Sequence, residues 1–238
     1  MSNAASSNVS RNRSSDRVRV VTCDDHPAIR EALSDTINEE MDMQVTGQAA
    51  TAEDAFAVLS EAEPHVAVVD ISLEDAHGLD LVQNLQAQYP DVEVVIFSMY
   101  DERVYAERAV RAGAAGYVMK AEPTKRVVEA IRTVRRGEVY LSRAMASRIL
   151  SQVARAGGGG DQEGPGFALD DLTDREMEVF QMLGEGKGVE DIADQLNLSR
   201  KTVETYRRRA KEKLDLDSIA ELLQHAIQWT HGQGAVRE

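Results

Sequence analysis

Short apolar runs and longer amphipathic stretches alternate through the first 136 residues. The short runs are rich in Val and Ile and predict five strands, at residues 18–23, 43–49, 66–70, 92–97 and 115–119. The run before Asp70 is continuously apolar, which indicates a strand buried on both faces. The longer stretches have apolar residues every three or four positions and predict helices that begin near Pro27, Thr51, Gly78, Glu102 and Thr124. Thr51 and Thr124 are predicted to be N-cap residues. Five alternations of strand and helix indicate an α/β domain, a (βα)5 unit with a doubly wound parallel sheet.

The pattern changes after residue 136. Residues 142–155 predict one more helix, and four consecutive glycines at 157–160 begin a stretch that suits a flexible tether. Beyond Leu172 the apolar spacing is helical, with helices predicted over 173–183, 189–196, 200–214 and 219–229. Thr173 and Glu176 predict a capping box at the first of these helices, and Ser199 predicts a cap at the third. The tight turn between the second and third helices predicts a helix-turn-helix. We therefore expect a disordered tail (1–17), the α/β domain (18–136), a linker (137–170) and a small all-α four-helix domain (171–238).

Composition narrows the class of protein. No apolar run reaches about 18 residues, so no transmembrane helix is expected, and the polar N-terminus does not resemble a signal peptide. The one cysteine, Cys23, lies in a predicted strand, which excludes an intramolecular disulfide and a Cys-based zinc site and fits a cytoplasmic location. The net charge of −14 argues weakly against nucleic-acid binding, unless positive charge is concentrated locally.

Polar residues stand where the predicted strands end. Asp24 and Asp25 follow the first strand, Asp70 ends the third, Ser98 follows the fourth, and Lys120 follows the fifth. Because the carboxyl ends of parallel strands meet at one edge of the sheet, where ligands bind, we expect these side chains to lie together. Each one taken alone is more simply explained as a residue that begins a loop, but the complete set favours a shared chemical site.

The residue types at this edge indicate its chemistry. Three carboxylates repel one another unless a cation joins them, and oxygen ligands favour a hard divalent ion such as Mg²⁺. Asp70 could then act as a nucleophile that accepts a phosphoryl group as an acyl phosphate. Mg²⁺ and the Lys120 ammonium would neutralise the phosphoryl oxygens, and the Ser98 hydroxyl would donate a hydrogen bond to one of them.

Residues 18–136 resemble the receiver domain of two-component response regulators. The resemblance rests on Asp24-Asp25, Asp70, Gly78, Ser98 and the segment from Tyr117 to Lys120. It implies that a sensor histidine kinase phosphorylates Asp70, with Ser98 and Lys120 contacting the phosphoryl group. It also implies that Tyr117 is an aromatic switch residue that moves with Ser98. The ligands of Mg²⁺ would be Asp24, Asp25, Asp70 and the backbone carbonyl of Ser72.

Two positions depart from this family pattern. Glu74 stands where many members have Pro, and Ala121 follows Lys120 where Pro is often found in a cis peptide. A receiver-like regulator that binds DNA or a partner without phosphorylation is therefore an alternative. The alternative from the enzyme class is a phosphatase that turns over an aspartyl phosphate. Such enzymes typically need a second acid two residues after the nucleophile, where this chain has Ser72, so no enzyme is expected.

The third helix of the C-terminal domain concentrates positive charge. Val203, Ala210 and Leu214 recur at helical spacing and predict the buried side, so the opposite face would enter a major groove. Arg and Lys suit phosphates or guanine, Glu can accept from cytosine, and Thr can contact a thymine methyl group. The candidate DNA-binding residues are Arg200, Lys201, Thr202, Glu204, Thr205, Arg207 and Arg208. A basic face that is merely solvated is an equal alternative if the charges are considered alone.

Residues 172–229 resemble the LuxR-type helix-turn-helix of the NarL/FixJ response regulators. The resemblance rests on Leu172-Thr173, Ile192-Ala193, Ser199, the segment 201–204 and Lys213-Leu214, among others. It implies a transcription regulator that binds promoter DNA and forms a homodimer when phosphorylated. Residues 188–190 are Gly-Val-Glu where members usually have Ser or Thr, then Asn, then Lys, so one contact to the DNA backbone is expected to be weaker.

Overall fold

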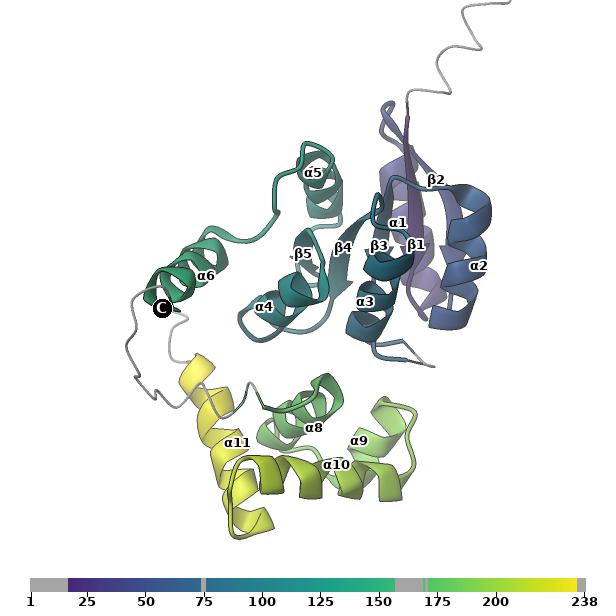
Figure 1. The fold of residues 1–238 in the computed structure, drawn as a ribbon. Helices are drawn as coiled ribbons and strands as arrows, with labels where there is room; N and C mark the ends of the chain where they lie inside the picture. The colour runs from purple at the N-terminus through teal and green to yellow at the C-terminus, as the bar shows by residue number, and fades with distance from the viewer. Residues whose placement is uncertain (1–16, 74–75, 157–168, 170, 235–238) are drawn as a thin grey trace, which may run out of the picture. The chain divides into compact units, whose positions relative to one another are not determined.

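The computed structural model describes residues 17–73, 76–156, 169 and 171–234 (Figure 1). Contacts between residues divide the chain into two compact units, residues 1–158 and 159–238. The helix expected in the linker falls in the first of these units. Glu74 and the four glycines at 157–160 lie outside the described residues. No helix in the described part of the chain is both long and apolar enough to span a bilayer.

The first unit contains a parallel sheet of five strands in the order β2-β1-β3-β4-β5, which confirms the expected α/β fold. The strands are β1 (Val18–Cys23), β2 (Met43–Ala49), β3 (Val66–Val69), β4 (Glu93–Ser98) and β5 (Gly116–Met119). The connecting helices are α1 (Pro27–Asn38), α2 (Ala52–Ala62), α3 (Gly78–Gln88) and α4 (Glu102–Ala112), and α5 (Lys125–Val134) follows β5. Strand β3 ends one residue earlier than expected, so Asp70 is the first residue beyond it.

The sheet is buried on both faces, as its valine-rich strands require. One face packs on α1 and α5, whose residues Leu33, Ile37 and Ile131 share a core cluster with Val68 and Val95 of the sheet. The intervening residues of the strands, such as Ala67 and Val69, point to the other face and are also buried. Burial of both faces leaves the edge at the carboxyl ends of the strands as the place where polar side chains can gather.

Of the two N-caps expected in the first unit, one is present in the structure and the other is not. The Thr51 side chain accepts a hydrogen bond from the backbone N–H of Asp54, so the cap expected for α2 is confirmed. The cap expected for α5 is wrong. Thr124 has helical backbone angles and its side chain makes no capping hydrogen bond. Instead the Thr124 carbonyl accepts from Val127 N–H, because a backbone turn already begins there.

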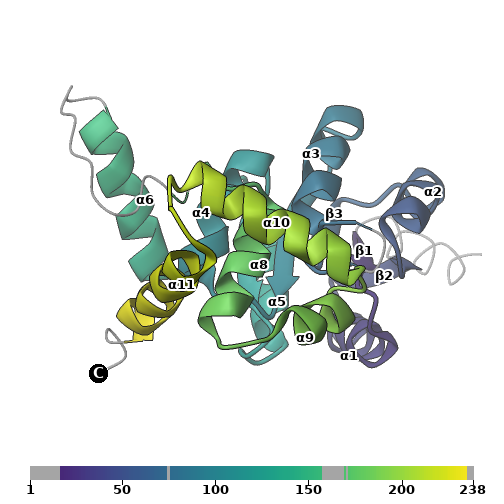
Figure 2. The ribbon, with the colours of Figure 1, turned by 90° about the horizontal axis from the view of Figure 1, so that it is seen from below.

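The second unit contains the helices α8 (Asp174–Gly184), α9 (Val189–Gln195), α10 (Arg200–Lys213) and α11 (Ile219–Gly234) (Figure 2). Thr173 and Glu176 form the expected capping box at the start of α8, and Ser199 caps α10. Asn197 has a φ of 49°, which gives the short turn between α9 and α10. The Trp229 ring lies 5.8 Å from the ring of Phe180, so it packs within its own unit.

Candidate functional site

The acidic residues after β1 and β3 lie together at the carboxyl edge of the sheet. The N–H of Asp70 donates to the carbonyl of Cys23 (2.8 Å), which places Asp70 beside the end of β1. Asp24, Asp25, His26 and Asp70 each offer one ligand atom, and these atoms all lie within 4.8 Å of one another. Such a set of oxygen atoms with one ring nitrogen could hold a divalent metal ion.

Lys120 reaches this cluster from β5, across the intervening strand β4. Its Nζ atom lies 2.6 Å from Asp24 Oδ2 and 2.6 Å from Asp70 Oδ2. Asp24 and Asp70 are 1% and 3% exposed, so one ammonium group is shared by two buried carboxylates. Removing one partner from a buried ionic cluster typically lowers the free energy of unfolding by about 3 to 5 kcal/mol, because a charge is then left uncompensated.

The local electrostatics favour a further cation. Burial raises the pKa of Asp70 to about 6, since the attraction of Lys120 only partly offsets desolvation and the repulsion of Asp24 adds to it. Burial opposes the charged form of Lys120, but Asp70 and Asp24 outweigh it and raise the lysine pKa. Asp70 Oδ1 is buried and has no hydrogen-bond partner among the described residues. The donor set therefore fits a hard divalent ion.

The raised pKa of Asp70 makes stability depend on pH. The pKa is about 6 in the folded protein against an ordinary value of 3.8, so folding takes up a proton between these values. This contribution is present below the lower value and is lost as pH rises through the upper one. With a chelator present, we expect the free energy of unfolding of the wild type to fall as pH rises, relative to that of Asp70→Asn. The fall should be about 2 to 3 kcal/mol between about pH 4 and pH 7.

Urea unfolding at a series of pH values measures this difference. Asp91→Asn removes an exposed carboxylate of the same unit and serves as the control variant. Parallel stability curves for the wild type and Asp70→Asn would contradict the assignment of a raised pKa to Asp70.

A hydrogen-bonded network joins Ser98 and Tyr117 to the loop after β3. Ser98 Oγ accepts from Tyr100 N–H (3.2 Å), and Tyr117 Oη donates to the Tyr100 carbonyl (3.0 Å). The Ser72 hydroxyl donates to Tyr100 Oη (3.1 Å). Tyr117 is 2% exposed, and this burial raises the pKa of its hydroxyl well above the usual range. Sequence analysis missed Tyr100, whose only signal is its place two residues after Ser98.

Three residues next to the site lie at the starts of the helices that border it. His26 lies at the start of α1, and its Nδ1 is 2.5 Å from Asp25 Oδ1. His77 is buried and its Nδ1 accepts from Leu79 N–H, so it caps α3. A Cβ atom on Gly78 would lie 2.0 Å from the Asp70 carbonyl oxygen. Only glycine allows α3 to begin this close to the Asp70 backbone.

Helix α10 carries the candidate DNA-binding residues of the second unit. Val203 and Ala210 are fully buried, as their spacing predicts, and Lys201, Glu204 and Arg208 are exposed. The other candidates differ in how far they are exposed to solvent. Arg200 is exposed, Thr202, Thr205 and Arg207 are half-buried, and the Thr205 hydroxyl donates to the Lys201 carbonyl.

The acid at the start of α9 pairs with the first residue of α10. Arg200 Nη1 lies 2.9 Å from Glu190 Oε1, and Arg200 Nε lies 3.3 Å from Glu204 Oε1. Two carboxylates therefore share this guanidinium. Exposed ion pairs are worth at most about 1 kcal/mol, so these pairs hold the Arg200 side chain only weakly.

Comparison with known proteins assigns the chain to a family. The model of the response regulator receiver domain matches residues 20–132, and that of the LuxR family of bacterial regulatory proteins matches residues 170–226. Oxygen regulatory protein NreC of Staphylococcus carnosus is 31% identical over 212 residues, which cover 88% of this chain and 97% of that protein. The chain belongs to the NarL/FixJ family of response regulators.

Other relatives of this response regulator agree with the assignment. The transcriptional regulatory protein YxjL of Bacillus subtilis is 31% identical over 212 residues, covering 89% of this chain and 96% of that protein. The structure of RcsB from Salmonella enterica serovar Typhimurium, bound to promoter rprA, superposes with a TM-score of 0.57. It is 21% identical and covers 88% of this chain and 98% of that one, so it supports the fold. The receiver match spans all the residues of the acidic edge, and the LuxR match spans α8 to α10.

Proposed function

We propose that this response regulator is controlled by phosphorylation of Asp70 and that it binds promoter DNA through α10. One observation carries the first part: the buried Asp70 carboxylate has an unpartnered oxygen and lies 2.6 Å from the Lys120 ammonium. A carboxylate in that setting can attack a phosphoryl group, while the ammonium balances the charge of the phosphoryl oxygens. The donor would be the phosphohistidine of a sensor histidine kinase.

Each neighbouring residue has a separate role in this proposal. Asp24, Asp25, Asp70 and the backbone carbonyl of Ser72 would hold Mg²⁺, which neutralises phosphoryl oxygens when bound. An Asp70 oxygen attacks phosphorus and forms an acyl phosphate as the phosphorus–nitrogen bond of the donor breaks. The Ser98 hydroxyl donates to a phosphoryl oxygen, and Lys120 changes its partner from the Asp70 carboxylate to the phosphoryl group.

The second part of the proposal concerns the output. Movement of Ser98 toward the phosphoryl group would disturb its contact with Tyr100, and through it Tyr117, which biases a two-state equilibrium of the receiver. The phosphorylated chain forms a homodimer that matches a two-fold DNA site, with one α10 helix in each major groove. A sensor histidine kinase and promoter DNA are then the partners, and both meet this protein in the cytoplasm.

Selection from a random double-stranded DNA library tests the whole proposal. The full chain is used with Mg²⁺, with and without acetyl phosphate, and Asp70→Asn is the control. We expect a site of two half-sites about one helical turn apart, bound about tenfold more tightly by the phosphorylated wild type. Enrichment that is the same for the wild type and Asp70→Asn under both conditions would favour a regulator that works without phosphorylation.

A further inference from the structure

The segment that follows α5 extends the sheet of the first unit. Tyr140 N–H donates to the Ala115 carbonyl (2.9 Å), and Tyr117 N–H donates to the Tyr140 carbonyl (2.9 Å). Tyr140 therefore pairs with β5 as a parallel bridge at Gly116. An edge strand normally exposes its backbone groups to other chains, so the chain itself covers part of this edge.

The next residues hold α6 (Arg143–Ala156) against α4. Ser142 N–H donates to Glu102 Oε1 (2.7 Å), and the Ser142 hydroxyl accepts from Met145 N–H (3.2 Å), which caps the first turn of α6. The Arg148 side chain donates to the Arg103 carbonyl (3.0 Å). Met145 is 2% exposed and Glu102 8% exposed, so the contact excludes most water. A hydrogen bond to a buried carboxylate is stronger than one between neutral groups.

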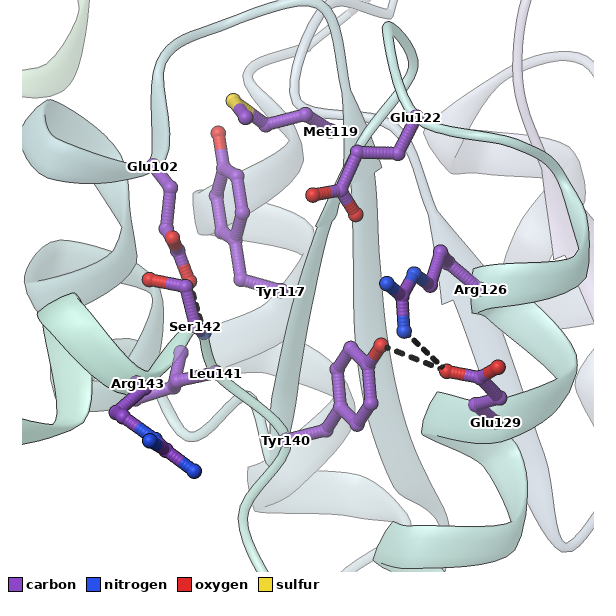
Figure 3. Close-up of a pocket in the computed structure, with 10 residues that line it drawn as sticks. All are labelled: Glu102, Tyr117, Met119, Glu122, Arg126, Glu129, Tyr140, Leu141, Ser142 and Arg143. Carbon is purple, nitrogen blue, oxygen red and sulfur yellow. Dashed lines mark hydrogen bonds and ion pairs between the residues drawn. The ribbon is translucent and has the colours of Figure 1, made fainter. Parts of the chain in front are cut away.

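A cavity of about 400 Å³ separates this contact from α5 (Figure 3). Glu102, Tyr117 and Tyr140 are among its lining residues, and Figure 3 shows the Tyr117 ring beside the Glu102 side chain. Glu102 and the Tyr117 ring therefore both border open space.

The same few residues connect this contact to the phosphorylation site. Glu102 begins α4 only four residues after Ser98, and Tyr100, between them, accepts from Tyr117 and donates to Ser98. A shift of residues 99–101 therefore moves the first turn of α4 as well. The structure shows Glu102 bonded to Ser142, and a carboxylate that lost this partner is expected to turn to solvent, because an unpaired buried charge is costly.

We propose that residues 140–145 form a latch that ties α6 to the switch, with the bond between Glu102 and Ser142 as the contact that opens. The latch rests on the proposed function and deepens it. In the unphosphorylated protein the latch is closed and α6 is held on α4. Phosphorylation of Asp70 moves residues 99–101, Glu102 leaves Ser142, and α6 is released from α4.

Hydrogen–deuterium exchange of the full chain tests the latch. Glu102→Ala removes the acceptor, and we expect exchange at residues 140–149 to become about tenfold faster without phosphorylation. Glu122→Ala removes a carboxylate that lines the same cavity but does not bond to Ser142, so it should exchange like the wild type. Glu102→Gln keeps an acceptor oxygen and should stay close to the wild type. Thermal melting checks that each variant folds.

Phosphorylation provides the second measurement. Wild type shown by intact mass to carry a phosphoryl group should exchange faster at residues 140–149, and Glu102→Ala should gain little more. Unchanged exchange in phosphorylated wild type, or equal exchange in Glu102→Ala and Glu122→Ala, would overturn the latch. If no phosphoryl group is gained, the proposed function fails. The effect of Glu102→Ala on the unphosphorylated protein still decides whether the contact holds α6.

Discussion

With Mg²⁺ and acetyl phosphate, the full-length wild-type protein is expected to gain the mass of one phosphoryl group, and Asp70→Asn is expected to gain none. The amide of Asn is a poor nucleophile and cannot form the acyl phosphate. The Asp70 carboxylate is buried, has an oxygen without a hydrogen-bond partner among the described residues and lies 2.6 Å from Lys120 Nζ. Loss of the adduct should therefore be complete.

Intact-mass spectrometry over a time course measures this result. Asp91→Asn removes an exposed carboxylate of the same unit and should be phosphorylated like the wild type. Chelation of Mg²⁺ should suppress the adduct, since the carboxylate cluster then keeps its excess negative charge and repels the donor. A phosphoryl group on Asp70→Asn at a comparable rate would show that another residue is the acceptor.

Replacement of both Lys201 and Arg208 by Ala is expected to weaken DNA binding by at least about tenfold and to lower the salt dependence. Both side chains are exposed on the α10 face opposite the buried Val203 and Ala210. Each lost phosphate contact removes about 0.9 from the slope of log affinity against log salt, so the slope should fall by about 2. The pair between Arg208 and Glu212 is exposed and does not prevent this role.

A second double variant with the same change in net charge distinguishes direct contact with DNA from the effect of overall charge. Replacement of Arg111 and Arg136 by Ala removes two exposed cations from the first unit and leaves α10 intact. Its DNA affinity and salt slope should stay near those of the wild type when titrations are made at several salt concentrations. The assignment of α10 to the DNA interface is refuted if the two double variants behave alike.

Sequence patterns predicted the fold because burial repeats locally. The valine-rich run before Asp70 indicated a strand buried on both faces, and β3 is such a strand. Helix starts were also predicted where a side chain completes the cap, as at Thr51, Thr173 and Ser199. At Thr124 the residue type suggested a cap, but the backbone was already helical, which residue type alone does not reveal.

The sequence predicted that Asp24, Asp25, Asp70 and Lys120 would meet at one edge of the sheet, but it did not predict their geometry. The ends of parallel strands place Asp24, Asp70 and Lys120 at one edge, whatever the details of packing. The Lys120 ammonium reaches both carboxylates across β4, and this contact depends on the strand order and on the length of the lysine side chain. The raised pKa of Asp70 follows from burial, which the position of a residue in a sequence does not give.

The sequence alone therefore determined the two domain types, the family and the set of polar residues at the strand ends. Only the tertiary structure decided that Tyr100 joins Ser72 to Ser98 and that Glu102 accepts from Ser142, forty residues further along the chain. Hydrophobic periodicity records which side of a local element is buried. A hydrogen bond between distant segments depends on how those elements pack, and no local pattern records that packing.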